Sequence, residues 1–142
     1  MNQQTLNQQT DPNGRVHIPV FYACDEHYIK YTAVSIHTLK KHASRDYIYD
    51  IHIMHAGMDP GNNIYAEMIS EPGFNVCFDD VSVYLDTITD KLPVRDYFSK
   101  TTYYRFFISE MFPEYRKALY IDSDTVVRGD VSELFNTDIS GW

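Results

Sequence analysis

Two aspartates separated by one residue stand out among the side chains that could carry chemistry. Asp122 and Asp124 directly follow an apolar run at residues 118–121, which predicts a buried strand. That strand would deliver both carboxylates to its carboxyl end, where open α/β sheets bind ligands. Mg²⁺ and Mn²⁺ prefer carboxylate oxygens and leave other positions to phosphate and water. The pair suggests metal-assisted handling of a phosphorylated substrate, although Asp-Ser-Asp also suits a solvated turn.

The length and charge of the chain narrow the classes of function. Its 142 residues suffice for one domain with a hydrophobic core, and its 44% hydrophobic and 15% aromatic content indicates a globular protein. The net charge of -8 argues against broad binding of nucleic acid or of an anionic membrane, because both need a basic surface. A phosphorylated substrate would therefore need a metal ion or a few local basic groups.

The sequence contains few features that indicate a cellular compartment. No apolar stretch is long enough for a transmembrane helix, and the N-terminus lacks the apolar core of a signal peptide, so we expect a cytoplasmic protein. Cys24 and Cys77 both lie in apolar, strand-like surroundings. We expect two small buried thiols there, rather than a disulfide or a pair of metal ligands.

The elements that position the two aspartates can be predicted from periodicity. Residues 1–16 are polar and repetitive and predict a disordered tail, so the ordered domain would span 17–142. Short apolar runs predict four strands, at 18–24, 48–55, 74–78 and 118–121. Amphipathic spacing predicts helices at about 29–39, 64–69 and 101–112, with a last helical turn at 132–135.

The third of these helices carries several specific expectations. Ser99 or Thr101 would cap its start, and Pro113 would end it. Its buried stripe would consist of four apolar side chains, namely Tyr104, Phe107, Ile108 and Met111.

Alternation of strands and helices predicts an α/β fold, with a mainly parallel sheet and helices on both faces. The carboxyl ends of the first and last strands, marked by Asp25 and Asp122, would then share one rim of the sheet. A nucleotide binds at this rim in such folds.

Four segments, in order, resemble one known family. They are Val20 to Tyr28, the following helix with Ala33-Val34-Ser35-Ile36, Thr101 to Phe106, and Leu119 to Val127 followed by Gly129-Asp130-Val131 and Glu133-Leu134-Phe135. Together they resemble the N-terminal half of glycosyltransferase family 8, which includes glycogenin and bacterial lipopolysaccharide galactosyl- and glucosyltransferases.

The resemblance implies a Rossmann-like GT-A nucleotide-diphospho-sugar transferase fold with its C-terminal part missing. It also implies a retaining transferase that moves glucose or galactose from a UDP-sugar to a glycan or lipopolysaccharide-type acceptor, with Mn²⁺ or Mg²⁺. The metal would neutralise charge on the departing UDP.

The resemblance assigns the family's site roles to residues at the matching positions of this sequence. Asp122 and Asp124 would hold the metal, and Ser123 between them would belong to the donor-binding loop. Asp25 would accept a hydrogen bond from uracil N3–H, Tyr28 would stack beside the base, and Arg105 would reach the sugar and phosphate region. The backbone of Ala23 would also touch the base.

Some positions depart from the family pattern. His27 stands where Asn is frequent, and Cys24 replaces a small residue. The family's third metal ligand, a histidine, and its catalytic and acceptor-side residues are expected beyond Trp142, as is any peripheral membrane association. None of the six histidines of the chain matches that ligand.

Alternatives remain open for several of these residues. Arg105 could be a solvated residue beside Thr101 and Ser109, Tyr28 could be a core aromatic, and Asp25 could cap the first helix. His52 and His55 lie three residues apart on a strand, so they should point to opposite faces and not chelate together.

Two other functions remain open as well. Asp122 and Asp124 also fit the first motif of haloacid-dehalogenase-type phosphatases, in which the first aspartate attacks phosphorus. However, that motif normally opens its fold, and here it lies near the end of the chain. The third possibility is a nucleotide-sugar-binding half-domain without catalysis.

Overall fold

Parallel strands form the centre of the fold. A computed structural model describes residues 9–59, 61, 65–88 and 101–141. Their sheet has four strands in the order β3-β2-β1-β4, and every neighbouring pair is parallel. The strands are β1 (Val16–Ala23), β2 (Tyr47–His55), β3 (Phe74–Asp80) and β4 (Leu119–Tyr120). The predicted parallel α/β fold is confirmed.

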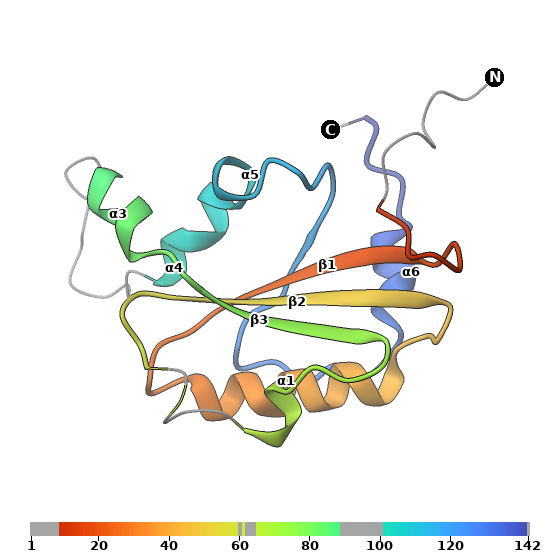
Figure 1. The fold of residues 1–142 in the computed structure, drawn as a ribbon, viewed down its shortest axis with the longest axis horizontal. Helices are drawn as coiled ribbons and strands as arrows, with labels where there is room; N and C mark the ends of the chain where they lie inside the picture. Colours follow the sequence, from red (N-terminus) through yellow and green to blue (C-terminus); the bar gives the residue numbers. More distant parts are fainter. Residues whose placement is uncertain (1–8, 60, 62–64, 89–100, 142) are drawn as a thin grey trace.

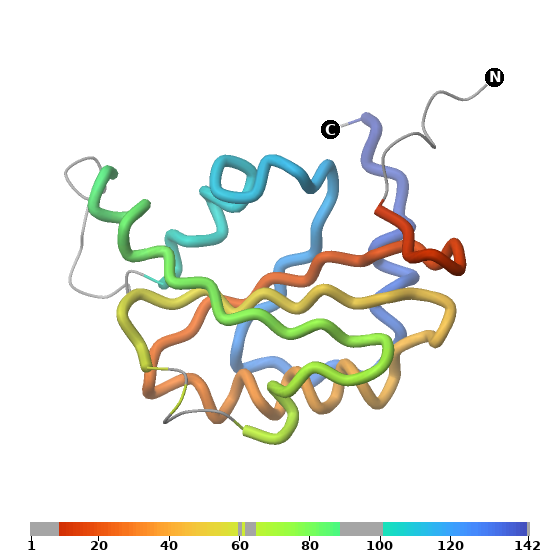
Figure 2. The backbone as a smooth tube through the Cα atoms, viewed as in Figure 1, coloured from red at the N-terminus to blue at the C-terminus, as the bar shows by residue number. Residues whose placement is uncertain are grey.

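Helices cover both faces of this sheet, as Figure 1 shows. One face carries α1 (Ile29–His42), and the 3₁₀ turn η2 (Ala66–Met68) packs beside that helix. The other face carries α3 (Ser82–Ile88), α4 (Thr101–Tyr104) and α5 (Ile108–Met111), while α6 (Val131–Phe135) follows β4. Figure 2 traces the same path through the backbone and shows the two layers on either side of the strands.

Alternation along β1 divides the core into two clusters. Ile18, Val20 and Tyr22 face α1, whereas Phe21 and Ala23 belong to the cluster beneath α3, α4 and α5. Such alternation follows from the two-residue period of a strand. Both faces of β1 are therefore buried, as expected of a strand inside a covered parallel sheet.

The first helix follows its sequence pattern closely. Ile29, Ala33, Ile36 and Leu39 are all buried against the sheet. The helix has no acidic residue in its first turn, while Lys40, Lys41 and His42 lie in its last turn. Positive side chains there interact favourably with the partial negative charge at a helix C-terminus.

Pro19 lies within β1, an interior strand, without disrupting the sheet. Ile121 donates its backbone N–H to the carbonyl of Phe21, so the N–H and C=O of Phe21 point toward β4. Because these groups point to the same side at every second residue of a strand, the backbone of Pro19 also faces the β4 side. Pairing with β4 begins only at Val20. The missing N–H of Pro19 thus falls before the start of β4, where no ladder hydrogen bond is lost.

Several details of the third predicted helix and of the last strand differ from the sequence predictions. The segment predicted as one helix at 101–112 is interrupted by a 3₁₀ turn, η4 (Arg105–Phe107). Of its predicted stripe, Tyr104 is buried and the other three residues are half-buried. Thr101 is the first residue of α4, and Ser99 lies outside the described residues. The last predicted strand forms ladder pairs at only two residues.

The predicted burial of both thiols was wrong for one of them. Cys24 directly follows the interior strand β1 and is buried, whereas Cys77 lies on the edge strand β3 and is exposed. Both are free thiols.

The N-terminal boundary also differs. Residues 9–15, expected in the tail, form a turn in which Asp11 accepts hydrogen bonds from the backbone of Asn13 and Arg15. Thr10 pairs with Val16 at the start of β1. Among the described helices, none has the length and apolar character needed to cross a membrane.

Candidate functional site

The register of the sheet brings the two predicted acidic positions to one rim. Phe21 of β1 pairs with Tyr120 of β4 in parallel. Asp25 and Asp122 follow these residues at the carboxyl ends of neighbouring strands, and the predicted juxtaposition is confirmed. This rim is where ligands bind in open α/β sheets.

Asp25 organises the turn that leads into α1. Its Oδ1 accepts hydrogen bonds from the backbone N–H groups of His27 at 2.9 Å and Tyr28 at 3.0 Å. Its own carbonyl accepts from Tyr28 and Ile29. Among the described residues, its second oxygen, Oδ2, has no hydrogen-bond partner and can accept from a ligand. The predicted helix-capping role and a ligand role are therefore compatible.

Ser123 fastens the loop of the two aspartates to β1. Its Oγ donates a 2.7 Å hydrogen bond to the carbonyl of Ala23, and its side chain is buried. One lone pair of the Ala23 carbonyl is therefore engaged by Ser123, and the second lone pair remains for the predicted contact with a base. The hydroxyl of Ser123 likewise serves the scaffold, which leaves its backbone for the predicted donor contact.

The residues after Ser123 tie the same loop to α1. Thr125 Oγ1 donates to the carbonyl of Asp122 at 2.8 Å and lies 3.0 Å from Ser35 Oγ. Val127 donates its N–H to Thr38 Oγ1 at 3.0 Å. The loop is thus held from both sides, while Asp122 and Asp124 are exposed to solvent. This alternation of exposed acids around a buried serine suits a pair of ligands directed outward.

Arg105 lies beside the first of these carboxylates. Its Nη1 is 3.7 Å from Asp122 Oδ1, and the two side chains are 37% and 59% exposed. Its guanidinium also lies over the Tyr120 ring, 5.7 Å from the centroid. Burial raises the pKa of Tyr120 to about 12, and the negative charge of Asp122 adds to this effect. Arg105 is therefore part of the acidic site and not an isolated solvated residue.

Tyr28 lies at the surface and not in the core. It is 46% exposed, and its ring meets that of Tyr31 at a centroid distance of 5.7 Å. The alternative of a buried core aromatic is therefore wrong, and the ring is available to a ligand.

A small cavity of about 130 Å³ opens next to Asp25. Its wall includes residues that follow the ends of β1 and β2 and two residues of α4, namely Cys24, Asp25, Glu26, Ala56, Gly57, Met58, Thr101 and Tyr104. Burial, followed by the charges of Asp25 and Asp80, raises the pKa of Tyr104 to about 12. A neutral phenol thus lies close to the carboxylate of Asp25.

Sequence reasoning missed the contribution of β2 and α4 to this cavity. Gly57, with φ of 71°, follows the end of β2 and could have been recognised as a turn at the same rim. Tyr104 was expected only to pack. Nothing in its local sequence indicates that it also reaches the turn at Asp25.

The two carboxylates suit a hard divalent cation, since both offer exposed oxygen ligands on one short loop. Within the described parts of the chain, no group of three or more His, Cys, Asp or Glu side chains is placed to hold a metal ion. His52 and His55 point to opposite faces of the sheet, as predicted. His52 packs on Phe21, whereas His55 packs on Phe78. A cation at Asp122 and Asp124 would take its other ligands from substrate and water.

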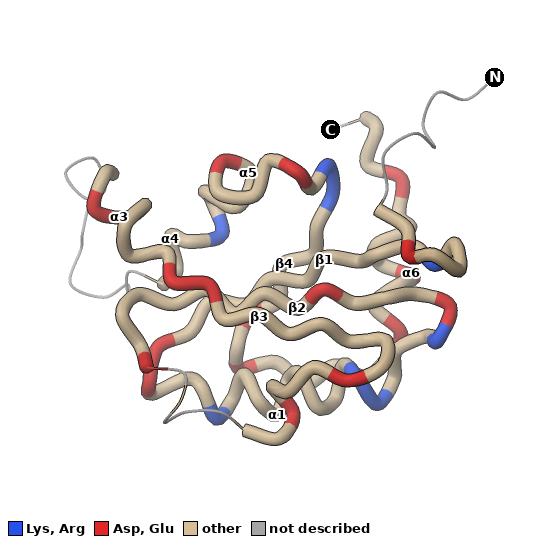
Figure 3. Tube along the Cα trace, in the orientation of Figure 1, with Lys and Arg blue, Asp and Glu red and all other residues tan. Residues whose placement is uncertain are grey.

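Charge is unevenly placed around the rim. Figure 3 shows acidic residues following the strand ends, while the basic residues of α1 lie toward its two ends. Asp79 and Asp80 end β3 on the same side as Asp25 and Asp122. Arg105 is thus a cation among several carboxylates.

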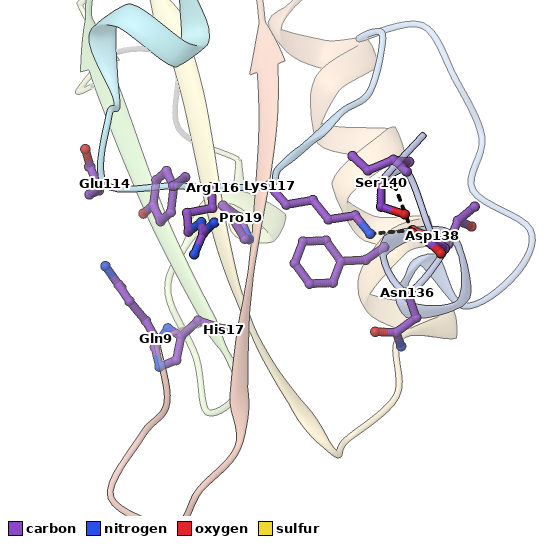
Figure 4. Close-up of a pocket in the computed structure, with 13 residues that line it drawn as sticks. Gln9, His17, Pro19, Glu114, Arg116, Lys117, Asn136, Asp138 and Ser140 are labelled. Carbon is purple, nitrogen blue, oxygen red and sulfur yellow. Dashed lines mark hydrogen bonds between the residues drawn. The ribbon is translucent and has the colours of Figure 1, made fainter. Parts of the chain in front are cut away.

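A larger cavity lies at the opposite ends of the strands, near the starts of β1 and β4, and Figure 4 shows it. It measures about 570 Å³ and is lined by residues from the start of β1, the loop before β4 and the segment after α6. Lys117 crosses toward that segment and donates a 2.5 Å hydrogen bond to the carbonyl of Thr137. None of the predicted site residues lines this cavity, so the candidate site is the rim with Asp25 and Asp122.

The fold and this rim define an α/β domain of the GT-A class. The family model described as Glycosyl transferase family 8 matches residues 19–142, and the chain belongs to that family. A protein of Haemophilus influenzae that is named as a glycosyltransferase is 30% identical over 127 residues, which cover 87% of this chain and 36% of that protein.

Solved structures agree with the family assignment. The bifunctional glycosyltransferase WbbM matches with a TM-score of 0.72 and 27% identity, covering 92% of this chain and 22% of WbbM. The galactosyltransferase LgtC, solved with donor and acceptor sugar analogues, matches with a TM-score of 0.69 and 28% identity, covering 85% of this chain and 43% of LgtC. The chain therefore spans less than half the length of these relatives. Family membership favours a glycosyltransferase over the dehalogenase-type phosphatase.

Proposed function

We propose that this chain forms the donor-binding part of a metal-dependent hexosyltransferase that uses a UDP-sugar. One observation carries the proposal: two exposed carboxylates and Arg105 lie together at the end of β4, beside the strand that ends at Asp25. A base-reading group, a metal site and a cation together suit the base and the charged diphosphate of a nucleoside diphosphate.

Asp25 is the group proposed to read the base. Its Oδ1 is engaged by the turn, which holds Oδ2 in a defined orientation. A carboxylate oxygen accepts from uracil N3–H and is repelled by the acceptor at the same position of cytosine. The ring of Tyr28 would cover one face of the base. UDP is therefore the preferred nucleotide.

Asp122 and Asp124 are proposed to hold Mn²⁺ or Mg²⁺. The bound cation would neutralise charge on the departing diphosphate. Arg105 can turn from Asp122 toward phosphate or sugar oxygens, because a weak, exposed ion pair costs little to break. With two protein carboxylates as ligands among the described residues, metal affinity should depend strongly on the diphosphate.

The sugar, the stereochemistry and the acceptor in the proposal come from the family. They are transfer of glucose or galactose with retention of configuration and a glycan or lipopolysaccharide-type acceptor. The proposed cytoplasmic location rests on the sequence signals alone. LgtC, whose structure contains donor and acceptor sugar analogues, supports the class of substrates in general terms. A nucleotide-sugar-binding protein without catalysis is the second candidate, because the described residues offer no third metal ligand beside Asp122 and Asp124.

Calorimetry with UDP, ADP and GDP, in the presence and absence of Mn²⁺, tests the donor assignment on the intact protein. We expect UDP to bind at least about ten-fold more tightly than ADP or GDP. In the Asp25→Asn variant the turn keeps its Oδ1 acceptor, while the ligand-facing oxygen becomes an NH₂ donor. This variant should lose the preference for UDP without unfolding.

Equal affinity of the wild-type protein for UDP and ADP would remove the base-reading role from Asp25. Release and transfer of sugar from UDP-glucose and UDP-galactose separate the two candidates, since a binding protein would retain UDP affinity and show neither reaction.

A further inference from the structure

Three exposed tyrosines surround one hollow on the outer side of the site. Tyr28, Tyr31 and Tyr65 are 46%, 47% and 42% exposed. They line an open depression of about 440 Å³ together with Glu26, His27, Ile29 and Lys30. A single exposed aromatic residue is ordinary, but several around one depression mark a binding surface.

Two separate segments of the chain build this tyrosine surface. Tyr28 and Tyr31 come from the start of α1, and Tyr65 precedes η2. The segment of η2 is held against α1 because Lys40 Nζ donates to the carbonyl of Ile69 at 3.0 Å. His37 Nδ1 also lies 3.7 Å from Glu67 Oε1. The cluster is therefore a product of tertiary structure and not of helical periodicity alone.

The tyrosine surface adjoins the donor cavity and extends away from it. Glu26 lines both hollows, whereas Tyr28, Tyr31 and Tyr65 line only the outer one. Tyr28 is the tyrosine nearest to Asp25 along the chain, so Tyr31 and Tyr65 are the two that are not needed to hold a nucleotide next to Asp25. A second ligand group could occupy this surface at the same time as the nucleotide.

The chemistry of the surface indicates a saccharide. Tyrosine rings offer flat apolar faces for the C–H faces of a pyranose, and their hydroxyl groups hydrogen-bond to sugar hydroxyls. Glu26 and Lys30 supply one acceptor and one donor of opposite charge, so the rim favours a neutral polar ligand over a strongly charged one. Lys30 Nζ lies 5.1 Å from the centroid of the Tyr31 ring, which helps to hold that ring in place.

We infer that Tyr31 and Tyr65, next to Tyr28, form a secondary saccharide-binding surface for a remote stretch of an oligosaccharide acceptor. This inference rests on the proposed function, in which the acceptor is a glycan. The surface would raise the local concentration of long acceptors near the donor site without taking part in the chemistry.

The test measures binding of glucose- and galactose-based oligosaccharides of increasing length to the intact protein. Tyr31→Ala and Tyr65→Ala should each weaken binding of the longer oligosaccharides by about ten-fold. Tyr31→Phe should retain most of the affinity, because the stacking face remains. Val83→Ala is the matched control, since Val83 is an exposed apolar residue on α3, over the other face of the sheet.

Kinetics give a second readout. In both alanine variants the KM for a long acceptor should rise while kcat, the KM for a short acceptor and UDP affinity stay unchanged. Unchanged oligosaccharide affinity in both variants would overturn the inference, and so would a wild-type protein that binds UDP with Mn²⁺ but no oligosaccharide. A wild-type protein that fails to bind UDP would instead refute the donor assignment, because oligosaccharide binding is measured without nucleotide.

Discussion

At the scale of single residues, the contact between Arg105 and Asp122 shows how the guanidinium is held in position and still remains free to bind a ligand. The two groups are 3.7 Å apart and partly exposed. Ion pairs of this kind contribute little to folding, because water screens them and the side chains lose entropy. The guanidinium is nevertheless held over Tyr120, so it stays near the metal-binding loop while its N–H groups remain free to rearrange.

Replacing Arg105 by lysine separates charge from geometry. Arg105→Lys keeps the positive charge but loses the planar fork that binds paired oxygens. We expect kcat for sugar transfer to fall by about ten- to hundred-fold, and the free energy of unfolding to change by less than about 0.5 kcal/mol. Steady-state kinetics and urea denaturation check the two parts. Wild-type turnover in Arg105→Lys would show that charge alone suffices.

Removing either exposed aspartate should abolish the metal dependence of nucleotide binding. Asp122→Ala and Asp124→Ala each delete one of the two proposed ligands, and both side chains are exposed, so the fold should remain intact. Titration of UDP with and without Mn²⁺ measures the effect. Asp86→Ala, an exposed acid on α3, is the control and should behave as wild type. A wild-type response to Mn²⁺ in both site variants would contradict the metal assignment.

At the scale of elements, the loop after β4 depends on one buried hydrogen bond. Ser123→Ala removes the donor to the carbonyl of Ala23 and leaves that carbonyl buried without its partner. We expect a loss of about 1 to 2 kcal/mol in unfolding free energy. UDP affinity with Mn²⁺ should also fall, because Asp122 and Asp124 would be held less firmly. Ser109→Ala, at an exposed position, should change neither quantity.

Helix α6 provides a pH-dependent test of local stability. Asp130 caps it: Oδ1 accepts from Ser132 N–H at 2.9 Å and Oδ2 accepts from Ser132 Oγ at 2.7 Å. Burial, the largest single influence, raises the pKa of Asp130, but the hydrogen bonds from Ser132, Ser44 and Tyr49 together outweigh it and the net pKa is lowered from 3.8. The stability from this charge is therefore fully present above that ordinary value. It is lost as the pH falls through the lowered pKa of the folded state.

Asp130→Ala should consequently cost about 1 kcal/mol at neutral pH. The difference from wild type should shrink as the pH falls below about 3.9. Urea denaturation across the acid range measures both effects. Asp46→Ala, an exposed aspartate, serves as control. A difference that stays constant with pH would show that the charge of Asp130 does not stabilise the fold.

The sequence predicted the elements that carry the site but not the contacts between them. The strand ends at Asp25 and Asp122 could be predicted because each strand is a short run of apolar residues in the local sequence. A parallel sheet then places both ends at one rim. The bond from Ser123 to Ala23 joins residues 100 positions apart, and it depends on the register of β1 with β4. The position of Tyr104 beside Asp25 depends likewise on how α4 packs over the sheet. The 3₁₀ turn at Arg105–Phe107 has three residues per turn and breaks the 3.6-residue pattern that predicted one helix.

At the scale of the whole molecule, charge opposes the proposed substrate. The chain has a net charge of -8, and several carboxylates follow the strand ends at the candidate site. A nucleoside diphosphate is also an anion, so long-range repulsion should weaken its approach. A divalent cation at Asp122 and Asp124 would change the sign of the local field. The net charge argues against broad nucleic-acid binding, but it says nothing against a single metal-bridged diphosphate.

This opposition predicts that salt affects UDP binding in opposite directions with and without metal. Raising the salt concentration from about 0.01 M to 0.1 M shortens the screening length from about 30 Å to about 10 Å. In chelator, screening reduces repulsion between the acidic protein and the diphosphate, so UDP affinity should rise. In saturating Mn²⁺, screening weakens the attraction of the cation and Arg105 for the diphosphate, so the affinity should fall. Calorimetric titration at both salt concentrations measures the two slopes, and uridine, which lacks the diphosphate, should show neither. If higher salt lowered UDP affinity equally in chelator and in Mn²⁺, the acidic surface would not repel the nucleotide. The bound metal would then not be the source of the attraction.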